Sequence, residues 1–443
     1  MDYRFSNKDI QKLIIPLIIE QLLSVLVGLA DSIMVAAAGE AAVASVSLVD
    51  TFIILFMNIF GALATGGAVV AGQFIGKKKY KEACRATDQV TLFVVAVALV
   101  IMAVMYAFKN VILHGAFGKI EKDVLDNCNI YFLIVTASLP FIALYNAGAA
   151  ICRAMGNSKI PMYMALLMNG INLCGNAILI YGLKMGVAGA AIPTLLSRAF
   201  AAIVIVLVLM NPKRQLHFSK PFTFRFQKNL LKKILYIGVP NGIEGSMFQL
   251  GKILVLSMVS GFGTASIAAN AVGNNIATFM ILPGVAVGYA LLSVSAQCAG
   301  AGEYNQVKYY TKKLLWWNQG MFLISNGLII LCLPLILKAY NLSAEATHIA
   351  RNLIWYHGIC CLLLWALSFT LPNTLRACND VRYCMTMSIA SMWLFRIAFS
   401  YILGLILGWG VLGIWVAMTI DWLFRATFFM IRYKREKWMK HKI

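Results

Sequence analysis

The feature that most constrains this chain is a succession of long apolar runs that covers it from end to end. A helix needs about 20 apolar residues to cross roughly 30 Å of hydrocarbon, where every backbone polar group must be satisfied internally. The runs are continuous and lack the short alternation of transmembrane strands. The sequence therefore predicts an all-α polytopic membrane protein with twelve transmembrane helices, beginning near residues 10, 48, 88, 124, 160, 187, 232, 270, 312, 347, 383 and 411.

The distribution of basic residues predicts how these helices are oriented. The chain has a formal net charge of +21, and 28 of its 38 Lys and Arg residues lie in segments that the twelve helices place on one side. Only 6 lie on the other side. By the positive-inside rule we expect a multi-pass plasma-membrane protein with both termini in the cytoplasm. The basic patches are explained as topology signals beside anionic lipid, so we expect a lipid bilayer and no nucleic acid as partner.

Residue types that support catalysis are sparse. The ten cysteines contain no C-x-x-C and the five histidines no H-x-x-x-H, so we expect no metal centre, no cofactor and no enzyme activity. A channel would show a filter-like loop or a ring of like charge, and the sequence has no such stretch. A channel or an intramembrane enzyme is therefore the least favoured class of function.

The chain compared with itself shows an internal duplication. At an offset of 224 residues, eleven positions of the first half between Pro16 and Tyr80 are identical to their counterparts between Pro240 and Tyr304, with no gap. We expect two pseudo-symmetric six-helix bundles: an N-lobe at 1–210, a cytoplasmic linker at 211–230 and a C-lobe at 231–443. Parallel repeats of this kind suit a transporter that works by alternating access.

Charged residues within the predicted helices are candidates for function, because each costs about 2.5 to 3.5 kcal/mol at the bilayer centre. Among the eight is Arg198, placed where a long side chain could snorkel toward the cytoplasm. Asp421 and Arg425 have the spacing of an ion pair within one helix. Arg396 lies near mid-helix, so we expect an acidic or carbonyl partner for it. The other four are Glu20, Asp31, Glu244 and Lys252.

The first predicted helix carries a polar stripe, because Glu20 and Asp31 are about three turns apart and Ser24 and Gly28 lie between them. The equivalent stripe of the seventh helix contains Asn241, Glu244, Phe248 and Lys252. The lobes differ deeper in the stripe, since Gly28 corresponds to Lys252 and Asp31 to Val255. Asp31 could bind a proton or hold a sodium ion. Alternatively, Asp31 and Lys252 pair across the lobes. We regard Glu20, Gly28, Glu244, Lys252 and Arg396 as substrate or gating candidates.

The fifth predicted helix presents Asn169, Asn172 and Asn176 on one face. Their amides could orient a carboxylate or supply oxygens to a cation. Hydrogen bonding between helices would explain them equally well. Both interpretations stay open at the level of sequence.

An ordered set of segments resembles the MATE family, the multidrug and toxic compound extrusion transporters. The segments are LADSIMVAAAGEAAVASVS, GQFIGKKKYKEA, CRAMGNSKIPM, GVAGAA, GVPNGIEGSMFQLGKILV and FGTASIAANAV. The resemblance runs over nearly the whole chain. It implies two six-helix lobes in a V and antiport of a bulky apolar or cationic organic compound against protons or sodium ions, by a monomer.

The resemblance also implies a cation-coupling site. The family's first-helix acid matches Asp31, its fifth-helix N-x-x-x-D matches Asn172 and Asn176, and its sixth-helix threonine matches Thr194. Asn176 departs from the pattern, because it is an amide where many members have a second acid. With one carboxylate fewer, the pattern allows either H⁺ or Na⁺ as the coupling ion at Asp31. A flippase for lipids or lipid-linked sugars, from the same superfamily, is the alternative within this class.

Overall fold

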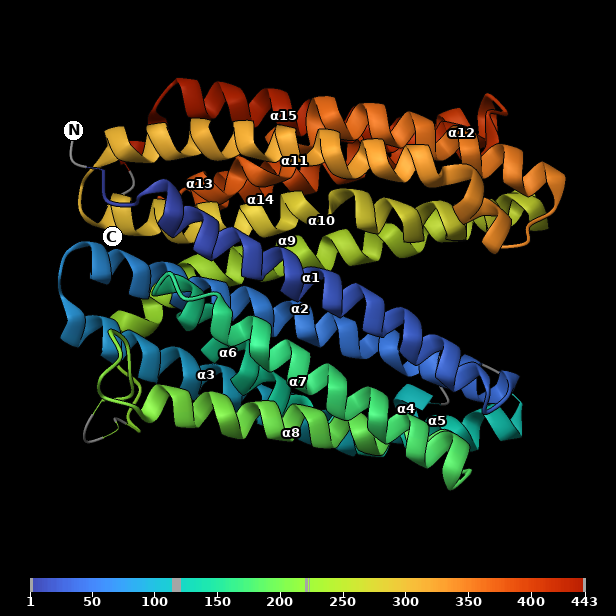
Figure 1. Cartoon of the computed structure of the whole chain (residues 1–443), viewed down its shortest axis with the longest axis horizontal. Coiled ribbons are helices and arrows are strands. Elements are labelled where there is room, and N and C mark those ends of the chain that lie inside the picture. The colour runs from blue at the N-terminus through green and yellow to red at the C-terminus, as the bar shows by residue number, and fades with distance from the viewer. Residues whose placement is uncertain (1–2, 114–120, 220–221, 223, 441–443) are drawn as a thin grey trace. The chain divides into compact units, whose positions relative to one another are not determined.

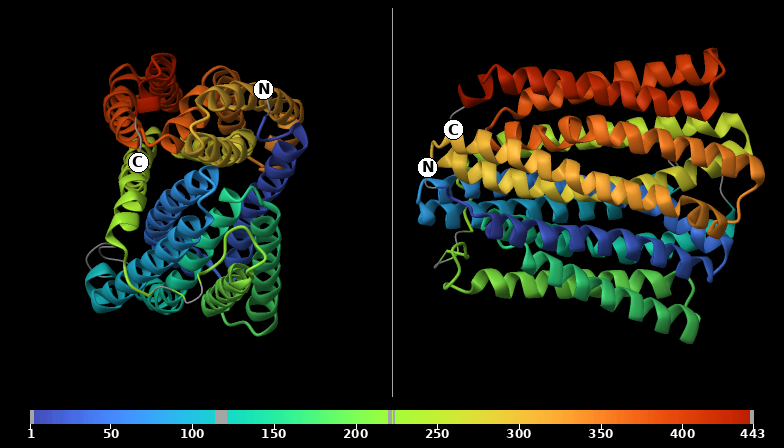
Figure 2. Two further views of the ribbon diagram at one scale, coloured as in Figure 1. Left: turned by 90° about the vertical axis from the view of Figure 1, so that its left-hand side faces the viewer. Right: turned by 45° about the horizontal axis from the view of Figure 1, so that its top comes forward.

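The computed structural model describes residues 3–113, 121–219, 222 and 224–440, and within them every regular element is a helix (Figures 1 and 2). Within these residues eleven helices are long and apolar enough to span a membrane, and a pair bent by 43° brings the number to twelve if the pair is one span. The predicted all-α polytopic fold is confirmed.

The described chain divides into two compact units, Gln11–Gly242 and Met1–Ile10 with Ile243–Ile443. The first unit contains a bundle drawn from blue to green in Figure 1. Its elements are α1 (Asn7–Ala36, from Gln11 on), α2 (Glu40–Gly76), α3 (Tyr80–Ala107), the short α4 (Lys109–Val111), α5 (Lys122–Ala137), α6 (Leu139–Ala154), α7 (Lys159–Asn176), a π-helical continuation (Ala177–Gly182) and α8 (Ala188–Met210).

The second unit repeats this plan with more interrupted helices. Three of its spans contain π-helical or 3₁₀ segments (Cys361–Thr370, Met392–Ile397, Ser400–Ile406 and Ser260–Phe262). Its α-helices are α9 (Lys228–Val259), α10 (Thr264–Gly300), α11 (Tyr304–Ala339), α12 (Ala344–Cys360), α13 (Pro372–Ala377), α14 (Val381–Ser391) and α15 (Gly410–Lys434).

The duplication is visible in the helix ends. Helices α2 and α10 are both 37 residues long, and each end of α10 lies 224 residues after the corresponding end of α2. Both helices follow a glycine with positive φ, 105° at Gly39 and 88° at Gly263. Only glycine adopts this conformation without steric cost, so the paired glycines start both helices at equivalent positions.

The compact units differ from the sequence-predicted lobes at their ends. The first turns of α9 pack in the first unit, where a side chain at Gly66 would come within 2.5 Å of the Ile234 carbonyl oxygen. The chain's first residues pack in the second unit, where Phe5 N donates to the Tyr310 hydroxyl at 2.8 Å. The boundary in the compact fold therefore lies within helices α1 and α9.

The segment between α8 and α9, which contains the predicted linker, is held against α3. Ser219 N donates to Asp88 Oδ1 at 3.1 Å, and Gln227 N donates to Gln89 Oε1 at 2.8 Å. The Gln89 amide in turn donates to the Arg225 carbonyl at 3.0 Å. Two buried polar residues of α3 therefore supply hydrogen bonds that the irregular backbone lacks.

Both ends of the described chain meet the beginning of α11. The Tyr3 ring stacks on Tyr309 with 4.3 Å between the ring centroids. Near the other end, the Tyr433 hydroxyl donates to the Lys308 carbonyl at 3.4 Å. The two ends therefore lie at the same end of the second unit. That this end is cytoplasmic stays a prediction.

Candidate functional site

A polar cluster in the first unit contains the four residues that the resemblance places at the cation site. Asp31 comes from α1, Asn172 and Asn176 from α7, and Thr194 from α8. A side chain at Gly175 would come within 2.7 Å of Pro193 Cβ, so this glycine permits close packing of α7 on α8. The close packing positions the α7 amides beside Thr194.

The side chains of this cluster form a chain of hydrogen bonds in which Asn176 is the first donor. Thr194 donates to the Ala190 carbonyl of its own helix at 2.9 Å and accepts from Asn172 Nδ2 at 3.0 Å. Asn176 Nδ2 donates both to Asn172 Oδ1, at 3.3 Å, and to Asp31 Oδ1. Asn176 is thus a hydrogen-bond donor to the carboxylate. The structure brings the four predicted residues together, and their coupling role stays a prediction.

Asn169, the third amide of the predicted face, does not join this chain of hydrogen bonds. Within the described residues its buried Nδ2 has no hydrogen-bond partner. Asn172 and Asn176 lie at the end of α7, where the helix continues as a π-helix. Such π-helical turns frequently mark functional sites.

The site also contains Arg198 and two residues that the sequence pattern does not single out, Asp50 and Tyr131. Asp50 of α2 accepts a hydrogen bond from the Tyr131 hydroxyl of α5 at 3.1 Å. Arg198 of α8 interacts electrostatically with Asp31, Asp50 and Tyr131. Two carboxylates and one guanidinium therefore share this site, which carries one negative charge in excess when both acids are ionised.

The interpretation of Arg198 as a snorkelling side chain is wrong. Its Nη1 donates to the Ser138 hydroxyl at 2.7 Å, and Ser138 is fully buried. Ser138 lies at the break between α5 and α6, where the helices bend by 43° and Pro140 follows in the first turn of α6. Proline disrupts the regular hydrogen bonds of a continuous helix, and the resulting break presents the Ser138 hydroxyl to the guanidinium.

Gly28 and Glu20 of the polar stripe have different surroundings from Asp31. Helix α1 is unbroken through Gly28, whose carbonyl accepts from Ser32 Oγ at 3.0 Å. Glu20 is buried, and its Oε1 accepts from Arg153 Nη1 of α6 at 2.9 Å. Glu20 is therefore one half of an ion pair in this structure.

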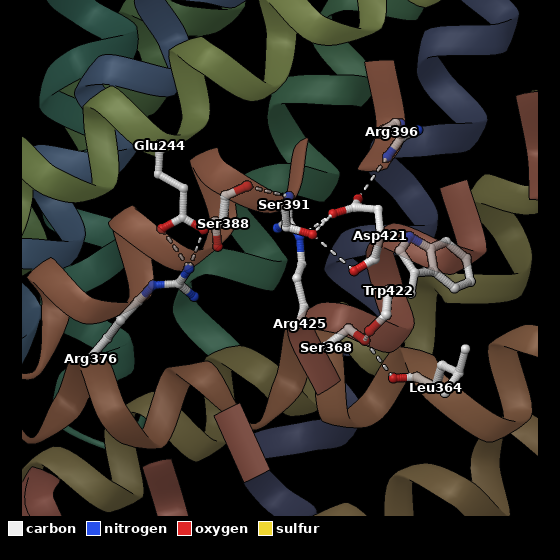
Figure 3. A network of polar contacts seen from close by, with 10 residues as sticks. All are labelled: Glu244, Leu364, Ser368, Arg376, Ser388, Ser391, Arg396, Asp421, Trp422 and Arg425. Carbon is white, nitrogen blue, oxygen red and sulfur yellow. Dashed lines mark hydrogen bonds and ion pairs between the residues drawn. The ribbon is translucent and has the colours of Figure 1, made fainter. Parts of the chain in front are cut away.

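The second unit contains the equivalent ion pair. Arg376 Nη2 donates to both carboxylate oxygens of Glu244, at 2.7 and 2.8 Å (Figure 3). Glu244 corresponds to Glu20 at the offset of 224, and Arg376 corresponds to Arg153 at an offset of 223. The repeat thus preserves an ion pair that fastens the first helix of each unit to the end of another helix.

A second polar network of this unit surrounds Asp421 of α15 (Figure 3). Arg425 Nε donates to Asp421 Oδ1 at 2.9 Å, which confirms the predicted ion pair within one helix. Ser391 of α14 donates to the same oxygen. The expected acidic partner of Arg396 is also Asp421, with 3.9 Å between Arg396 Nη1 and Asp421 Oδ2. Lys252 Nζ lies 5.1 Å from the centroid of the Phe248 ring.

The comparisons with known proteins agree with this architecture. The sequence model of the MatE family matches the chain twice, over residues 16–178 and 240–402. Both ends of the second match are displaced by 224 residues from those of the first, which is the offset found within the sequence itself.

Two relatives from Bacillus subtilis (strain 168) match over most of their lengths. One, an "Uncharacterized transporter YisQ", is 27% identical over 96% of this chain and 93% of that protein. The other, a "Probable multidrug resistance protein YoeA", is 28% identical over 85% of this chain and 82% of that protein. A solved structure described as the "outward-facing conformation of a multidrug resistance MATE family transporter of the MOP superfamily" superposes with a TM-score of 0.91 at 20% identity. The match covers 98% of this chain and 97% of the other.

Proposed function

The chain belongs to the MatE family, and from this premise we propose that it is a secondary active exporter in the plasma membrane. It is a carrier rather than an enzyme, with both termini in the cytoplasm. It moves an organic compound outward by alternating access while a cation enters through the first unit. The names of relatives such as the probable multidrug resistance protein YoeA support export of foreign compounds as the cellular role.

The observation that carries this proposal is the cluster around Asp31. A coupling site must bind and release a cation within the membrane, and it therefore needs an ionisable group held by protein. Asp31 is half-buried, receives a hydrogen bond from Asn176 and interacts with Arg198 and Asp50. Binding of one positive charge neutralises the excess charge of the two acids and one guanidinium. This change favours a different packing of α1 around Gly28, the state that releases substrate outward.

The hydrogen-bond directions favour a proton over a sodium ion. Sodium, like other hard cations, needs several oxygen ligands at once. The two carboxylates of the site instead face donors, because Asn176 donates to Asp31 and Tyr131 donates to Asp50. Thr194 and Asn172 already use their oxygens within the cluster, so among its four side chains only Asn176 Oδ1 is left as an amide oxygen without a partner in the described part of the chain. A proton needs a single carboxylate oxygen, so we propose proton coupling, with sodium as the competing ion.

Flux measurements in proteoliposomes test the proposal. Ethidium and naphthalenesulfonate serve as a cationic and an anionic probe, under a pH gradient and a sodium gradient imposed separately. We expect the pH gradient to drive at least one probe and the sodium gradient at constant pH to drive neither. Asp31→Asn should reduce driven flux to the level of empty liposomes.

The matched control is Glu40→Gln, which removes an exposed acid from the first turn of the neighbouring helix α2. We expect this variant to keep its flux. Undiminished flux in Asp31→Asn would refute coupling through this residue. Flux driven by the sodium gradient alone would refute proton coupling and identify sodium as the coupling ion.

A flippase for lipids or lipid-linked sugars is the second candidate. It is favoured by the cationic residues of the second unit, Lys252, Arg396 and Arg425, because anionic head groups need such partners. Transfer of a fluorescent phosphatidylglycerol between leaflets, measured by dithionite quenching, distinguishes it from the exporter.

A further inference from the structure

Three cationic side chains of the second unit surround one aromatic ring. The ring belongs to Phe248 of α9. Its centroid lies 5.1 Å from Lys252 Nζ, 5.1 Å from Arg396 Cζ and 5.6 Å from Arg425 Cζ. The three cations come from α9, the π-helical segment Met392–Ile397 and α15. Elements distant in sequence thus bring positive charge to one place within the membrane-spanning part of the unit.

This charge is not balanced by the acids that the structure describes. Asp421 forms the ion pairs with Arg425 and Arg396, at 2.9 and 3.9 Å. Glu244, the nearby second acid, is already paired with Arg376. Among the described residues no ion pair involves Lys252, so the cluster of three cations and Asp421 carries two positive charges in excess.

The unmet hydrogen-bonding capacity of the cluster points to a ligand. The Arg396 side chain is nine-tenths buried, yet its Nε is without a hydrogen-bond partner in the described part of the chain. Lys252 has an exposed side chain, and its ammonium group makes no hydrogen bond to the same residues. An uncompensated cation in a membrane-spanning helix is costly, and such residues mark the pathways of substrates or ions.

The duplicated positions of the first unit show that the repeat does not require these cations. Lys252 corresponds to Gly28 and Arg396 to Asn172 at the offset of 224. Ser400, whose buried hydroxyl lacks a partner among the described residues, corresponds to Asn176. Positions that hold a glycine and two neutral amides in the first unit therefore hold two cations and a serine in the second.

We propose that the second unit binds an organic anion, with its acidic group between Lys252 and Arg396 and its apolar body beside Phe248. A carboxylate, sulfonate or phosphate would receive charge-assisted hydrogen bonds from the two cations. The aromatic ring, which packs edge-on to Phe369, offers apolar contact to the rest of the compound. That this anion is the exported compound rests on the proposed transport function, whereas its binding does not.

Equilibrium dialysis with protein in phosphatidylcholine nanodiscs tests the site. Naphthalenesulfonate is the probe, and naphthylmethylammonium is its cationic match in size and shape. We expect the anion to bind and the cation to bind at least about tenfold more weakly. Lys252→Gln and Arg396→Gln should each weaken the anion about tenfold or more, because each removes a charge-assisted hydrogen bond.

Two further variants separate the site from general effects of charge and folding. Lys252→Arg keeps the positive charge and should retain binding. Lys232→Gln removes an exposed lysine from the same helix and should leave binding unchanged. Equal binding of the two probes would overturn the proposal. Naphthalenesulfonate that binds Lys252→Gln as tightly as the unaltered protein would overturn it as well.

A lipid head group and a soluble compound share the chemistry that this site recognises, and phosphatidylglycerol separates them. If nanodiscs with phosphatidylglycerol abolish naphthalenesulfonate binding, the site binds the anionic lipid; if binding persists, it selects soluble anions. Either result supports an anion site. Anion binding without gradient-driven flux would remove the transport function and keep the site. Gradient-driven flux of ethidium with no binding of naphthalenesulfonate would keep the transport function and remove the anion site.

Discussion

The ion pair between Glu244 and Arg376 should contribute more to stability than its duplicate between Glu20 and Arg153. In the second unit one guanidinium nitrogen donates to both carboxylate oxygens, at 2.7 and 2.8 Å. In the first unit the structure has one such hydrogen bond, at 2.9 Å. All four side chains are largely buried, with 10 to 17% of their surface exposed. Solvent therefore screens both pairs only weakly.

The magnitude follows from these contacts. Removing one partner of a buried pair leaves the other charge uncompensated and costs about 3 to 5 kcal/mol, so Glu244→Gln should fall in this range. A hydrogen bond to a charged group contributes about 1.5 to 3 kcal/mol. The two hydrogen bonds share one donor nitrogen, so their contributions do not add in full. The coupling energy in a double-mutant cycle of Glu244→Gln with Arg376→Met should therefore reach about 2 to 4 kcal/mol. The cycle of Glu20→Gln with Arg153→Met should give about half of that.

The measurement is the free energy of unfolding by denaturant titration in detergent micelles, with tryptophan fluorescence as the signal. Both cycles are made in the same background, so differences between detergents cancel. A coupling energy in the second unit below about 0.5 kcal/mol, the value typical of exposed pairs, would refute the reasoning. Equal coupling in both units would show that the second hydrogen bond contributes nothing.

Two further predictions concern packing and ion selectivity. Gly413→Ala should destabilise the protein by about 1 to 3 kcal/mol, because its Cβ would come within 2.7 Å of the Leu403 backbone. Gly61→Ala, with nothing within 4 Å, is the control in the same denaturant titration and should be neutral or stabilising. Asn176→Asp should make sodium raise the melting temperature, because it replaces the amide donor to Asp31 with carboxylate oxygens. Sodium should leave the unaltered protein unchanged, and an equal shift in both would contradict the donor argument.

The architecture could be predicted because its determinants are local and repeated. The length of apolar runs fixes the number of spans, and the identical positions at an offset of 224 fix the duplication. Positive-φ glycines at Gly39 and Gly263 begin equivalent helices, so even these helix ends follow the repeat. Helix interruptions are harder to predict from the sequence, because the π-helical segment around Arg396 depends on packing among distant helices.

Only part of the candidate site follows from the sequence, and the remaining residues show why. The apolar run of the second span begins near residue 48, so the run places Asp50 at the beginning of a helix. Helix α2 in fact begins at Glu40, and Asp50 lies nearly three turns inside it. An acid at a helix end needs no partner, and no local pattern points to Tyr131, 81 residues away. The role of Arg198 likewise depends on Ser138 being presented at a bend. Contacts across such separations are set by packing.

The divergence between duplicated positions carries more information about function than the identities. Identical pairs, such as the two glutamates that hold an arginine, maintain the scaffold in both units. Residues that differ in charge are free of that requirement, because the same scaffold forms with either residue. The exchange of Gly28 for Lys252 and of Asn172 for Arg396 introduces two costly cations into a fold that exists without them. The energetic cost of these cations is retained where the binding of a ligand compensates it. This favours the binding of an anion by the second unit, beside the binding of a cation by the first.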